Sequence, residues 1–363
     1  MKRIFAALTA AAMCVSFAAC ARETEQNTTA AEQTTAEISA VTQAAPEWEW
    51  QKDAPDNQGL DSSVLDDIHS TFDSFNLLSS VIVKNGYIID EYFKDGYDES
   101  SVFVLNSASK SVTSALIGIA IDKGYIESVD VHLSEYFPQV LQNGDARWAQ
   151  ITIRHLLNHT SGIDTTDDAG WMEWRNSENW IEYILNSPII SDPGAEFSYS
   201  TGNTHLLAAI LEQATGMSEY EFGRQYLFGP VGMDSVRIDT DAQGVSDGGN
   251  GIHMTPYDMA RFGLLFMNNG AWQGEQILSR QWVADSTSVQ YDRNTGSADY
   301  GYQWWVRTFG DNDYPAFFAQ GHAGQYIFVV PQLELVIVFT SNYTGRTSIY
   351  WQLVNQIVNA CYE

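Results

Sequence analysis

Strand patterns stand near both ends of this chain, and a long, mostly helical stretch separates them. Residues 81–83 and 87–92 are rich in β-branched and aromatic side chains, and they flank Lys84-Asn85-Gly86. Asn-Gly between two such runs is the strongest short signal for a hairpin. The C-terminal part predicts strands at residues 300–307, 325–330 and 333–340, with Pro331 separating the last two, and a closing helix at residues 349–358.

An antiparallel sheet completed by both ends of the chain and flanked by helices fits this pattern. Residues from about 130 to 288 carry helical patterns and turn signals, so we expect them to form a mostly helical lobe. The predicted fold class is therefore α+β, an α/β sandwich with a second lobe. A cleft between the two parts is the expected place for a site.

Ser107 and Lys110 open a long apolar helix pattern, three residues apart. Apolar residues then recur every three or four positions, Gly124 stops the pattern, and Asn106 or Ser107 can cap its start. Residues i and i+3 lie on one face of a helix. A buried lysine has a lowered pKa, so its amine can act as the base that activates the serine hydroxyl. The alternative is a capping serine beside a solvated lysine.

Composition excludes some classes of partner. The chain has 363 residues, and its 18 basic and 46 acidic residues give a net charge of −28. Such a charge argues against binding to nucleic acid or to anionic membrane surfaces. The hydrophobic content of 44% is ordinary for a globular protein, so we expect a sizeable core.

The N-terminal residues predict a targeting segment. Two basic residues precede a short apolar run at residues 4–17, and Ala18-Ala19-Cys20 follows it. The run is too short to span a membrane. A cysteine after small residues resembles a bacterial lipobox, with Phe17 less usual at its first position. This resemblance implies a signal peptide over residues 1–20 and a lipid on Cys20. An ordinary secreted protein cut nearby and an uncleaved anchor are the alternatives.

Residues 21–45 are rich in Thr, Ala, Glu and Gln, and this composition predicts a disordered tether. The folded domain is then residues 46–363. Loss of Cys14 with the signal and lipidation of Cys20 would leave only Cys361, so we expect no intrachain disulfide. We expect an extracytoplasmic protein held at the bacterial cell membrane by its lipid.

Three further segments accompany Ser107-x-x-Lys110. They are residues 151–163, Pro193-Gly194-Ala195-Glu196-Phe197-Ser198-Tyr199-Ser200-Thr201, and Gly321-His322-Ala323-Gly324-Gln325. Together these motifs resemble the serine hydrolase family that contains class C β-lactamases, D-Ala-D-Ala carboxypeptidases and related esterases. Residues 254–263 and 300–305 also look like that family, and the resemblance runs from about Trp48 to the C-terminus. It implies a β-lactamase/transpeptidase-like fold.

The resemblance implies a role for each matching residue. Ser107 matches the nucleophile, Lys110 its partner, and Tyr199 the tyrosine that handles the proton with that lysine. We expect the lysine ammonium to lower the pKa of Tyr199, since a phenol needs a lowered pKa to act as a base near neutrality. The backbone N–H groups of Ser107 and Gln325 match the oxyanion hole.

Two positions depart from the family pattern in the expected substrate-binding wall. His322-Ala323-Gly324 matches the K-T-G motif with histidine in place of lysine, and Thr201 replaces the asparagine of Y-x-N. The family uses that lysine and asparagine to hold the carboxylate and amide of β-lactams. Histidine is mostly neutral at pH 7, and threonine lacks the amide. These departures argue against efficient β-lactam hydrolysis.

Several other motifs have simpler structural interpretations than functional ones. Ser246 stands in a G-x-S-x-G match inside a polar loop, where no strand precedes it as a nucleophile elbow requires. Asp239-x-Asp241 lacks the glutamate of a calcium loop. His155 and His159 lack the glutamate of a zinc helix, so we interpret them as structural. Aromatic residues cluster in the insert, either as core or as the lining of an acyl pocket: Trp171, Trp174, Trp180 and Tyr183.

The sequence thus predicts an exported serine hydrolase that cleaves a small ester or amide through an acyl-Ser107 intermediate, without metal or cofactor. The alternatives are a D-amino-acid peptidase or D-Ala-D-Ala carboxypeptidase acting on cell-wall peptides, and a weak β-lactamase. A non-catalytic lipoprotein that binds penicillin or wall peptides ranks below these.

Overall fold

The computed structural model describes residues 48–362. The predicted signal peptide at residues 1–20, the tether at residues 21–45 and the lipidated Cys20 lie outside the described residues. Residues 48–362 belong to one compact unit that begins at Trp48. None of the helices in this part of the chain is long and apolar enough to cross a membrane.

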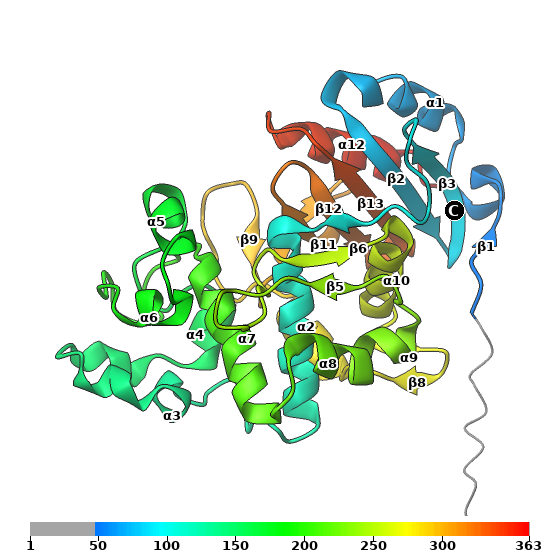
Figure 1. Ribbon diagram of the computed structural model, residues 1–363. Helices are drawn as coiled ribbons and strands as arrows, with labels where there is room; N and C mark the ends of the chain where they lie inside the picture. Colours follow the sequence, from blue (N-terminus) through cyan, green and yellow to red (C-terminus); the bar gives the residue numbers. More distant parts are fainter. Residues whose placement is uncertain (1–47, 363) are drawn as a thin grey trace, which may run out of the picture. The chain divides into compact units, whose positions relative to one another are not determined.

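An eight-stranded sheet forms the centre of the unit, and both ends of the chain contribute to it (Figure 1). All neighbouring strands pair antiparallel except β1 and β3, which are parallel. In sheet order, the strands are β1 (Gln51–Lys52), β3 (Tyr87–Phe93), β2 (Leu77–Lys84), β13 (Leu335–Ser341), β12 (Gln325–Val330), β11 (Tyr314–Gly321), β10 (Trp305–Phe309) and β9 (Asp299–Tyr300).

The sequence-based prediction of the fold class is confirmed. The β2–β3 hairpin turns at Asn85 and Gly86, whose φ angles of 53° and 83° are the left-handed values that this turn requires. Pro331 begins the short helix that separates β12 from β13.

Two details of the predicted sheet are wrong. Residues 300–307 do not form one strand, because β9 and β10 are separate strands that pair with each other. The strand β11 was not predicted at all, although it lies between β10 and β12. Its second residue is Pro315, and proline within a run argues against a strand unless it stands near the start.

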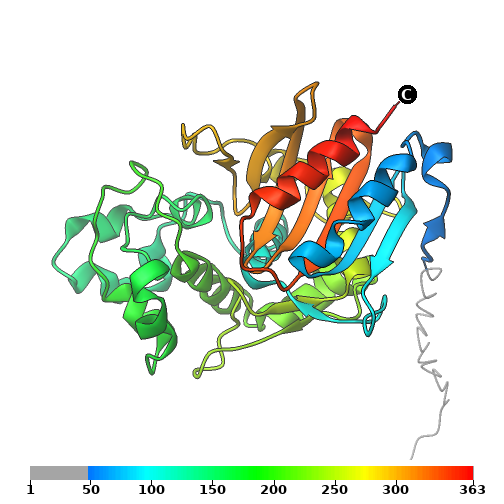
Figure 2. The same ribbon diagram turned by 90° about the horizontal axis from the view of Figure 1, so that it is seen from above.

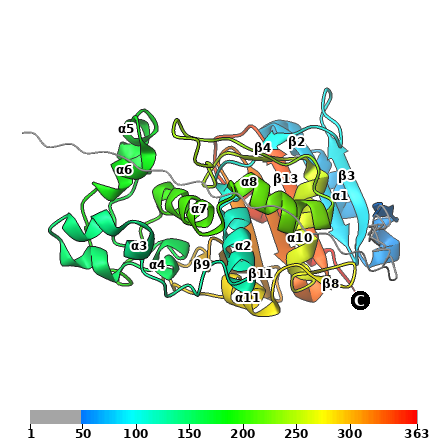
Figure 3. The same ribbon diagram turned by 60° about the horizontal axis from the view of Figure 1, so that its bottom comes forward.

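Helices cover both faces of the sheet. Figure 2 shows α12 (Ser348–Asn359) and α1 (Ser63–His69) on one face, where they pack on Ile82, Phe328 and Ile337. The opposite face presents alternate residues of the same strands, and it is covered by α2 (Ser109–Asp122) and α10 (Pro256–Met267) (Figure 3). This alternation follows from the two-residue period of a strand.

The middle of the chain forms a mostly helical lobe (Figure 1), but the predicted extent of residues 130–288 is wrong, because α10 packs on the sheet. Its helices are α3 (Leu133–Tyr136), α4 (Ile153–Leu157), α5 (Trp171–Arg175), α6 (Trp180–Leu185) and α7 (Thr201–Thr215). Between α7 and β9 the chain adds α8 (Glu219–Gly223), α9 (Gly229–Val231) and α11 (Arg280–Ser286). The same stretch holds β5 (Arg237–Ile238) and β6 (Ile252–Met254), which form a small sheet with β4 (Phe103–Val104) from before α2, and the pair β7 (Ala271–Trp272) and β8 (Glu275–Gln276).

The tryptophans of the insert belong mainly to the core of this lobe. Trp174 and Trp180 are buried, and both pack on His205 of α7. Ser246 lies in a loop, where its hydroxyl donates a hydrogen bond to Glu212 at 2.6 Å. His205 and His253 pair with Asp241 and Asp239 respectively, which accounts for the two aspartates that hinted at a calcium loop.

Candidate active site

Ser107 lies in a single turn of 3₁₀ helix, Asn106–Ala108, which runs directly into α2. Neither Asn106 nor Ser107 caps the helix through its side chain, so the predicted capping role is wrong. Instead, the Asn106 amide donates a hydrogen bond to the carbonyl of His322 at 3.0 Å. Asn106 also has a φ of 49°, an unfavourable value that asparagine tolerates better than most residues. The turn before Ser107 is thus fixed to the opposite wall of the site.

Lys110 is buried directly behind Ser107. Its side chain is 1% exposed, and Nζ donates hydrogen bonds to Ser107 Oγ at 3.2 Å, Thr201 Oγ1 at 3.0 Å and the Gly249 carbonyl at 2.9 Å. Burial lowers the pKa of Lys110 from 10.5 to about 8, although Asp167 and Asp247 oppose this shift. A substantial fraction of the amine is therefore neutral near pH 8, and it lies within reach of the serine proton.

Tyr199 lies beside both Ser107 and Lys110: Lys110 Nζ is 5.0 Å from the centre of its phenol ring, and Tyr199 lines the same pocket as Ser107. Burial raises the pKa of Tyr199, and the Ser107 hydroxyl opposes this only in part. The expectation that the lysine lowers the pKa of Tyr199 is therefore wrong: desolvation of the phenolate dominates. The neighbouring His159 is neutral at pH 7, since burial and Lys110 hold its pKa well below 6.5. Lys110, rather than Tyr199, is the group that can act as a base in the resting site.

Thr201 faces the lysine and not the solvent. It is fully buried, accepts a hydrogen bond from Lys110, and donates one to Asp167 Oδ1 at 3.0 Å. Asp167 Oδ2 also accepts from the Thr201 N–H at 2.5 Å. Thr201 therefore connects the lysine to a carboxylate, a contact different from the substrate contact expected for it.

The turn between β11 and β12 forms the facing wall. Ala323 and Gly324 have φ values of 61° and 94°, and a Cβ on Gly324 would overlap the Tyr350 hydroxyl. Gly321, at the end of β11, approaches the serine turn so closely that a Cβ would overlap the Leu105 carbonyl and lie 3.2 Å from Ala108 N. Gln325, the first residue of β12, follows Gly324 directly. The turn that carries the Ser107 N–H thus packs against the end of β11, which pairs with Gln325 of β12.

A pocket of about 240 Å³ opens between these walls. Ser107 and Tyr199 line it on one side, and the exposed His322 belongs to the other. Most of the remaining lining is aromatic or small and neutral: Trp305, Gln320, Gly321, Ala323, Gly324, Tyr343, Thr344, Gly345, Thr347 and Tyr350. Within the described residues, no group of three or more His, Cys, Asp or Glu side chains could hold a metal ion.

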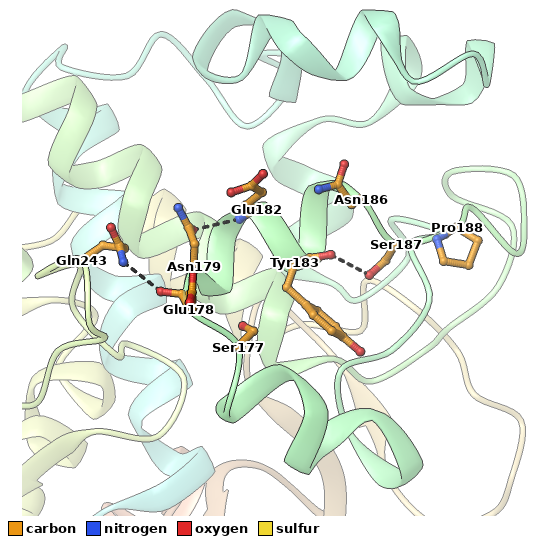
Figure 4. A pocket seen from close by; sticks show the side chains of 9 residues that line it. All are labelled: Ser177, Glu178, Asn179, Glu182, Tyr183, Asn186, Ser187, Pro188 and Gln243. Carbon is orange, nitrogen blue, oxygen red and sulfur yellow. Dashed lines mark hydrogen bonds between the residues drawn. The ribbon is translucent and has the colours of Figure 1, made fainter.

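A larger hollow of about 670 Å³ lies on the helical lobe (Figure 4). It is lined by polar side chains around α6, including Glu178, Asn179 and Glu182, and by Gln243. None of the residues gathered around Lys110 lines it, so its size alone does not make it a catalytic site.

The sequence did not indicate two residues that touch the serine–lysine pair, or a third that acts on Lys110 through Thr201. Asn250 Oδ1 accepts a hydrogen bond from Ser107 Oγ at 3.3 Å, Gly249 accepts from Lys110 through its carbonyl, and Asp167 holds Thr201. Asn250 follows the G-x-S-x-G match almost directly, so a glycine-rich loop with an asparagine was the available signal. Its contact with Ser107 depends on packing across 143 residues of chain.

Comparison with known proteins fits this geometry. A family model described as Beta-lactamase matches residues 78–351. This chain belongs to the beta-lactamase family of serine hydrolases. The match includes Ser107, Lys110, Tyr199 and the turn at residues 322–324, so the resemblance seen in the sequence is confirmed.

Several known proteins are similar to this one over most of the chain. The 6-aminohexanoate-dimer hydrolase of Paenarthrobacter ureafaciens is 26% identical over 75% of this chain and 74% of its own length. The structure of a putative 6-aminohexanoate-dimer hydrolase from Bacillus anthracis has a TM-score of 0.71 and 24% identity, covering 84% of this chain and 86% of that one. EstCE1, a hydrolase with promiscuous acyltransferase activity, has a TM-score of 0.67 and 20% identity, covering 81% and 97%. These structures confirm the β-lactamase/transpeptidase-like fold.

Proposed function

We propose that this family member is an exported hydrolase of small esters or linear amides, and that it works through an acyl-Ser107 intermediate. The observation that carries the proposal is the buried Lys110 amine, which lies 3.2 Å from the Oγ of Ser107, a residue that lines the 240 Å³ pocket. Burial lowers the pKa of Lys110 to about 8, so the amine can accept the serine proton at mildly alkaline pH.

In the proposed reaction, Lys110 Nζ takes the Ser107 proton while Oγ attacks the substrate carbonyl carbon. The tetrahedral oxyanion lies between the N–H groups of Ser107 and Gln325. Lys110 returns the proton through the Tyr199 phenol to the leaving alcohol or amine as its bond to carbon breaks. The raised pKa of Tyr199 suits this role, because the phenol stays protonated and relays a proton without ionising at rest. Water then attacks the acyl-Ser107 ester by the same route, and the acid departs.

The pocket lining favours a neutral ester or amide over a β-lactam. Aromatic side chains such as Trp305, Tyr343 and Tyr350 form much of the pocket, and they suit an uncharged acyl chain. His322 stands where the family pattern has a lysine for the β-lactam carboxylate, and Thr201 is occupied by Lys110 and Asp167. The name of the Paenarthrobacter relative, a hydrolase of 6-aminohexanoate dimer, points to a linear amide as a second substrate to test.

The proposal also includes the cellular location. The lipobox-like Ala18-Ala19-Cys20 and the polar residues 21–45 support export, cleavage before Cys20 and attachment to the membrane by a lipid on that cysteine. Labelling of the expressed protein with radioactive palmitate tests this part. A Cys20→Ala variant that still carries the label would contradict it.

The test of the activity compares the wild-type protein with Ser107→Ala on four substrates. These are a short-chain p-nitrophenyl ester, linear 6-aminohexanoate dimer, a D-Ala-D-Ala peptide and a chromogenic cephalosporin. We expect Ser107-dependent turnover of the ester or the linear amide and little turnover of the cephalosporin. Fast release of D-alanine, or fast cephalosporin cleavage, would replace the proposed substrate class by the corresponding alternative.

A further inference from the structure

A glycine-rich loop, residues 247–251, threads between the helices that surround Lys110. We call this Asp-Gly-Gly-Asn-Gly segment the glycine loop. A Cβ on Gly248 would lie 2.5 Å from Thr113 Oγ1, and a Cβ on Gly249 would lie 2.6 Å from Thr201 Cγ2. Only glycine therefore fits at these two positions. Because these glycines lie so close to Thr113 and Thr201, the backbone of the glycine loop reaches the active site.

The glycine loop supplies two of the contacts that define the resting site. The Gly249 carbonyl accepts a hydrogen bond from Lys110 Nζ at 2.9 Å, and Asn250 Oδ1 accepts one from Ser107 Oγ at 3.3 Å. The loop folds back through the Asp247 carbonyl, which accepts from the N–H groups of Asn250 at 3.2 Å and Gly251 at 2.7 Å. Asp247 is thus the anchor of the turn that presents both acceptors.

The side chain of Asp247 is held from the helical lobe. Arg175, the last residue of α5, places Nη1 2.5 Å from Asp247 Oδ2, and the aspartate side chain is only 3% exposed. The guanidinium lies 4.0 Å from the ring centre of Trp180, which fixes its plane. Only the aspartate end of this pair is buried, because the Arg175 side chain is 31% exposed. Removing Arg175 would leave the Asp247 charge buried without its counter-ion, which is unfavourable. The Arg175–Asp247 pair therefore fixes both the place and the charge of the loop.

A second contact joins the helical lobe to the chain just before the glycine loop, without any charge. Gln243 Nε2 donates a hydrogen bond to the Glu178 carbonyl at 2.8 Å, and Figure 4 shows this bond at the edge of the lobe. It offers a matched control for the ion pair, because it connects the lobe to the segment just before the glycine loop.

Lys110 is surrounded by titratable groups from several elements. Asp247 from the glycine loop and Asp167 from the loop before α5 both raise its pKa. Tyr199 and Tyr300 are neutral because burial raises their pKa values, and His159 is neutral because its pKa is low. Glu219 of α8, which contacts Gly248 through Thr113, has a pKa raised by burial to about 8 and is largely protonated at pH 7. Asp247 and Asp167 are therefore the carboxylates acting on Lys110, and Arg175 is the counter-ion of the first.

We propose that Arg175 and Asp247 are positioning residues for catalysis: their ion pair holds the glycine loop on Ser107 and Lys110, and the Arg175 charge offsets part of the stabilisation that Asp247 gives to the lysine ammonium. The pair acts through Lys110 and does not touch substrate. This inference rests on the proposed function, since it assigns the pair a part in making Lys110 the base for Ser107.

The test measures kcat/KM for a p-nitrophenyl ester against pH in the full-length protein. The variants are Arg175→Met, Asp247→Asn, the double variant, and Arg175→Lys, which restores the charge. With Arg175→Met the unpaired carboxylate favours the ammonium, so we expect the acid-side midpoint to rise by about half to one pH unit. Asp247→Asn should lower the midpoint, the double variant should follow Asp247→Asn, and Arg175→Lys should stay near the wild type.

A merely structural role predicts a different result. Loss of packing would reduce the size of kcat/KM and the melting temperature but leave the midpoint in place, as we expect for the control Gln243→Ala. The inference is overturned if the midpoint moves in the same direction in Arg175→Met and Asp247→Asn. It is also overturned if the midpoint moves in neither variant. If Arg175→Met does not fold, the comparison of Asp247→Asn with Gln243→Ala decides it.

A second readout separates this inference from the proposed function. The chain has six lysines, so carbon-13 labelling at the lysine ε position gives few signals, and the Lys110 signal is the one missing in Lys110→Arg. The midpoint of the Lys110 titration should rise in Arg175→Met and fall in Asp247→Asn, as the midpoint of kcat/KM does. If ester turnover survives in Ser107→Ala, the proposed function is wrong, whereas the lysine titration still tests the effect of the pair on Lys110. Unchanged titration with Ser107-dependent turnover refutes the inference alone.

Discussion

Replacing Lys110 by methionine should change how the stability of the protein depends on pH. The side chain is 1% exposed, and burial lowers its pKa from 10.5 to about 8. Below pH 8 the lysine is protonated in both the folded and the unfolded chain, and the folded state carries the full cost of the buried charge. Between pH 8 and 10.5 the unfolded chain binds more protons than the folded one, so the free energy of unfolding rises with pH.

The size of the effect follows from the displacement of the pKa. A pKa lowered by about 2.5 pH units corresponds to about 3 kcal/mol, at about 1.4 kcal/mol for each pH unit. The wild-type protein should therefore gain about 3 kcal/mol between pH 7 and pH 11 relative to Lys110→Met. The methionine variant also loses three hydrogen bonds, but this loss does not depend on pH. Tyrosines with raised pKa values, such as Tyr326, affect both proteins alike and cancel in the difference.

Urea unfolding of both proteins at intervals from pH 6 to pH 11 measures this difference. Both should carry Ser107→Ala, so that hydrolytic activity plays no part. A stability difference that stays constant over this range would show that Lys110 keeps an ordinary pKa. That result would refute the reasoning on which its role as a base depends.

Three further predictions concern activity and stability. The kcat/KM for an ester should rise with pH, and the midpoint of this rise should lie near pH 8, the pKa of Lys110. A midpoint below pH 6 would contradict the role of Lys110 as the base. Gly321→Ala should reduce kcat/KM by about a hundredfold, because the added Cβ would push the turn at residues 322–324 away from Ser107. The control Gly86→Ala, in an open turn, should leave kcat/KM unchanged, and equal losses in both variants would refute this account. The free energy of unfolding of the wild type, relative to that of Glu219→Gln, should fall by several kcal/mol between pH 4.5 and pH 8, because the folded protein keeps the Glu219 proton to about pH 8 and the unfolded chain loses it near pH 4.5. Free energies of unfolding that stay a constant amount apart over this range would contradict the raised pKa.

Local patterns in the sequence predicted the elements that depend on local physics. The hairpin at Asn85-Gly86, the helix after Ser107 and the helix near residues 348–359 each follow from turn preference or apolar periodicity, and the structure has all three. The strand β11 was missed because Pro315 and the turn residues before it outweigh a short run of Phe and Ala. Its place in the sheet comes from pairing with β10 and β12, which lie on both sides of it.

The motifs of the sequence likewise indicated most of the residues around the site, but not its electrostatics. Ser107, Lys110 and the turn at residues 322–324 come together as the family resemblance implies. The pKa of Tyr199 could not be predicted, because its direction depends on burial, which outweighs the nearby lysine. Asn250 was missed for a similar reason, since a loop far along the chain reaches Ser107 only through close packing of its glycines.

Trapping of the acyl-enzyme tests the central claim most directly. The full-length protein is mixed with a slowly turning-over p-nitrophenyl ester, quenched in acid and digested, and the peptide that contains residue 107 is analysed by mass spectrometry. The account predicts that this peptide gains the mass of the acyl group on Ser107, and that Ser107→Ala gains none and releases no burst of p-nitrophenol. An acyl group on another residue, or an undiminished burst in Ser107→Ala, would contradict it.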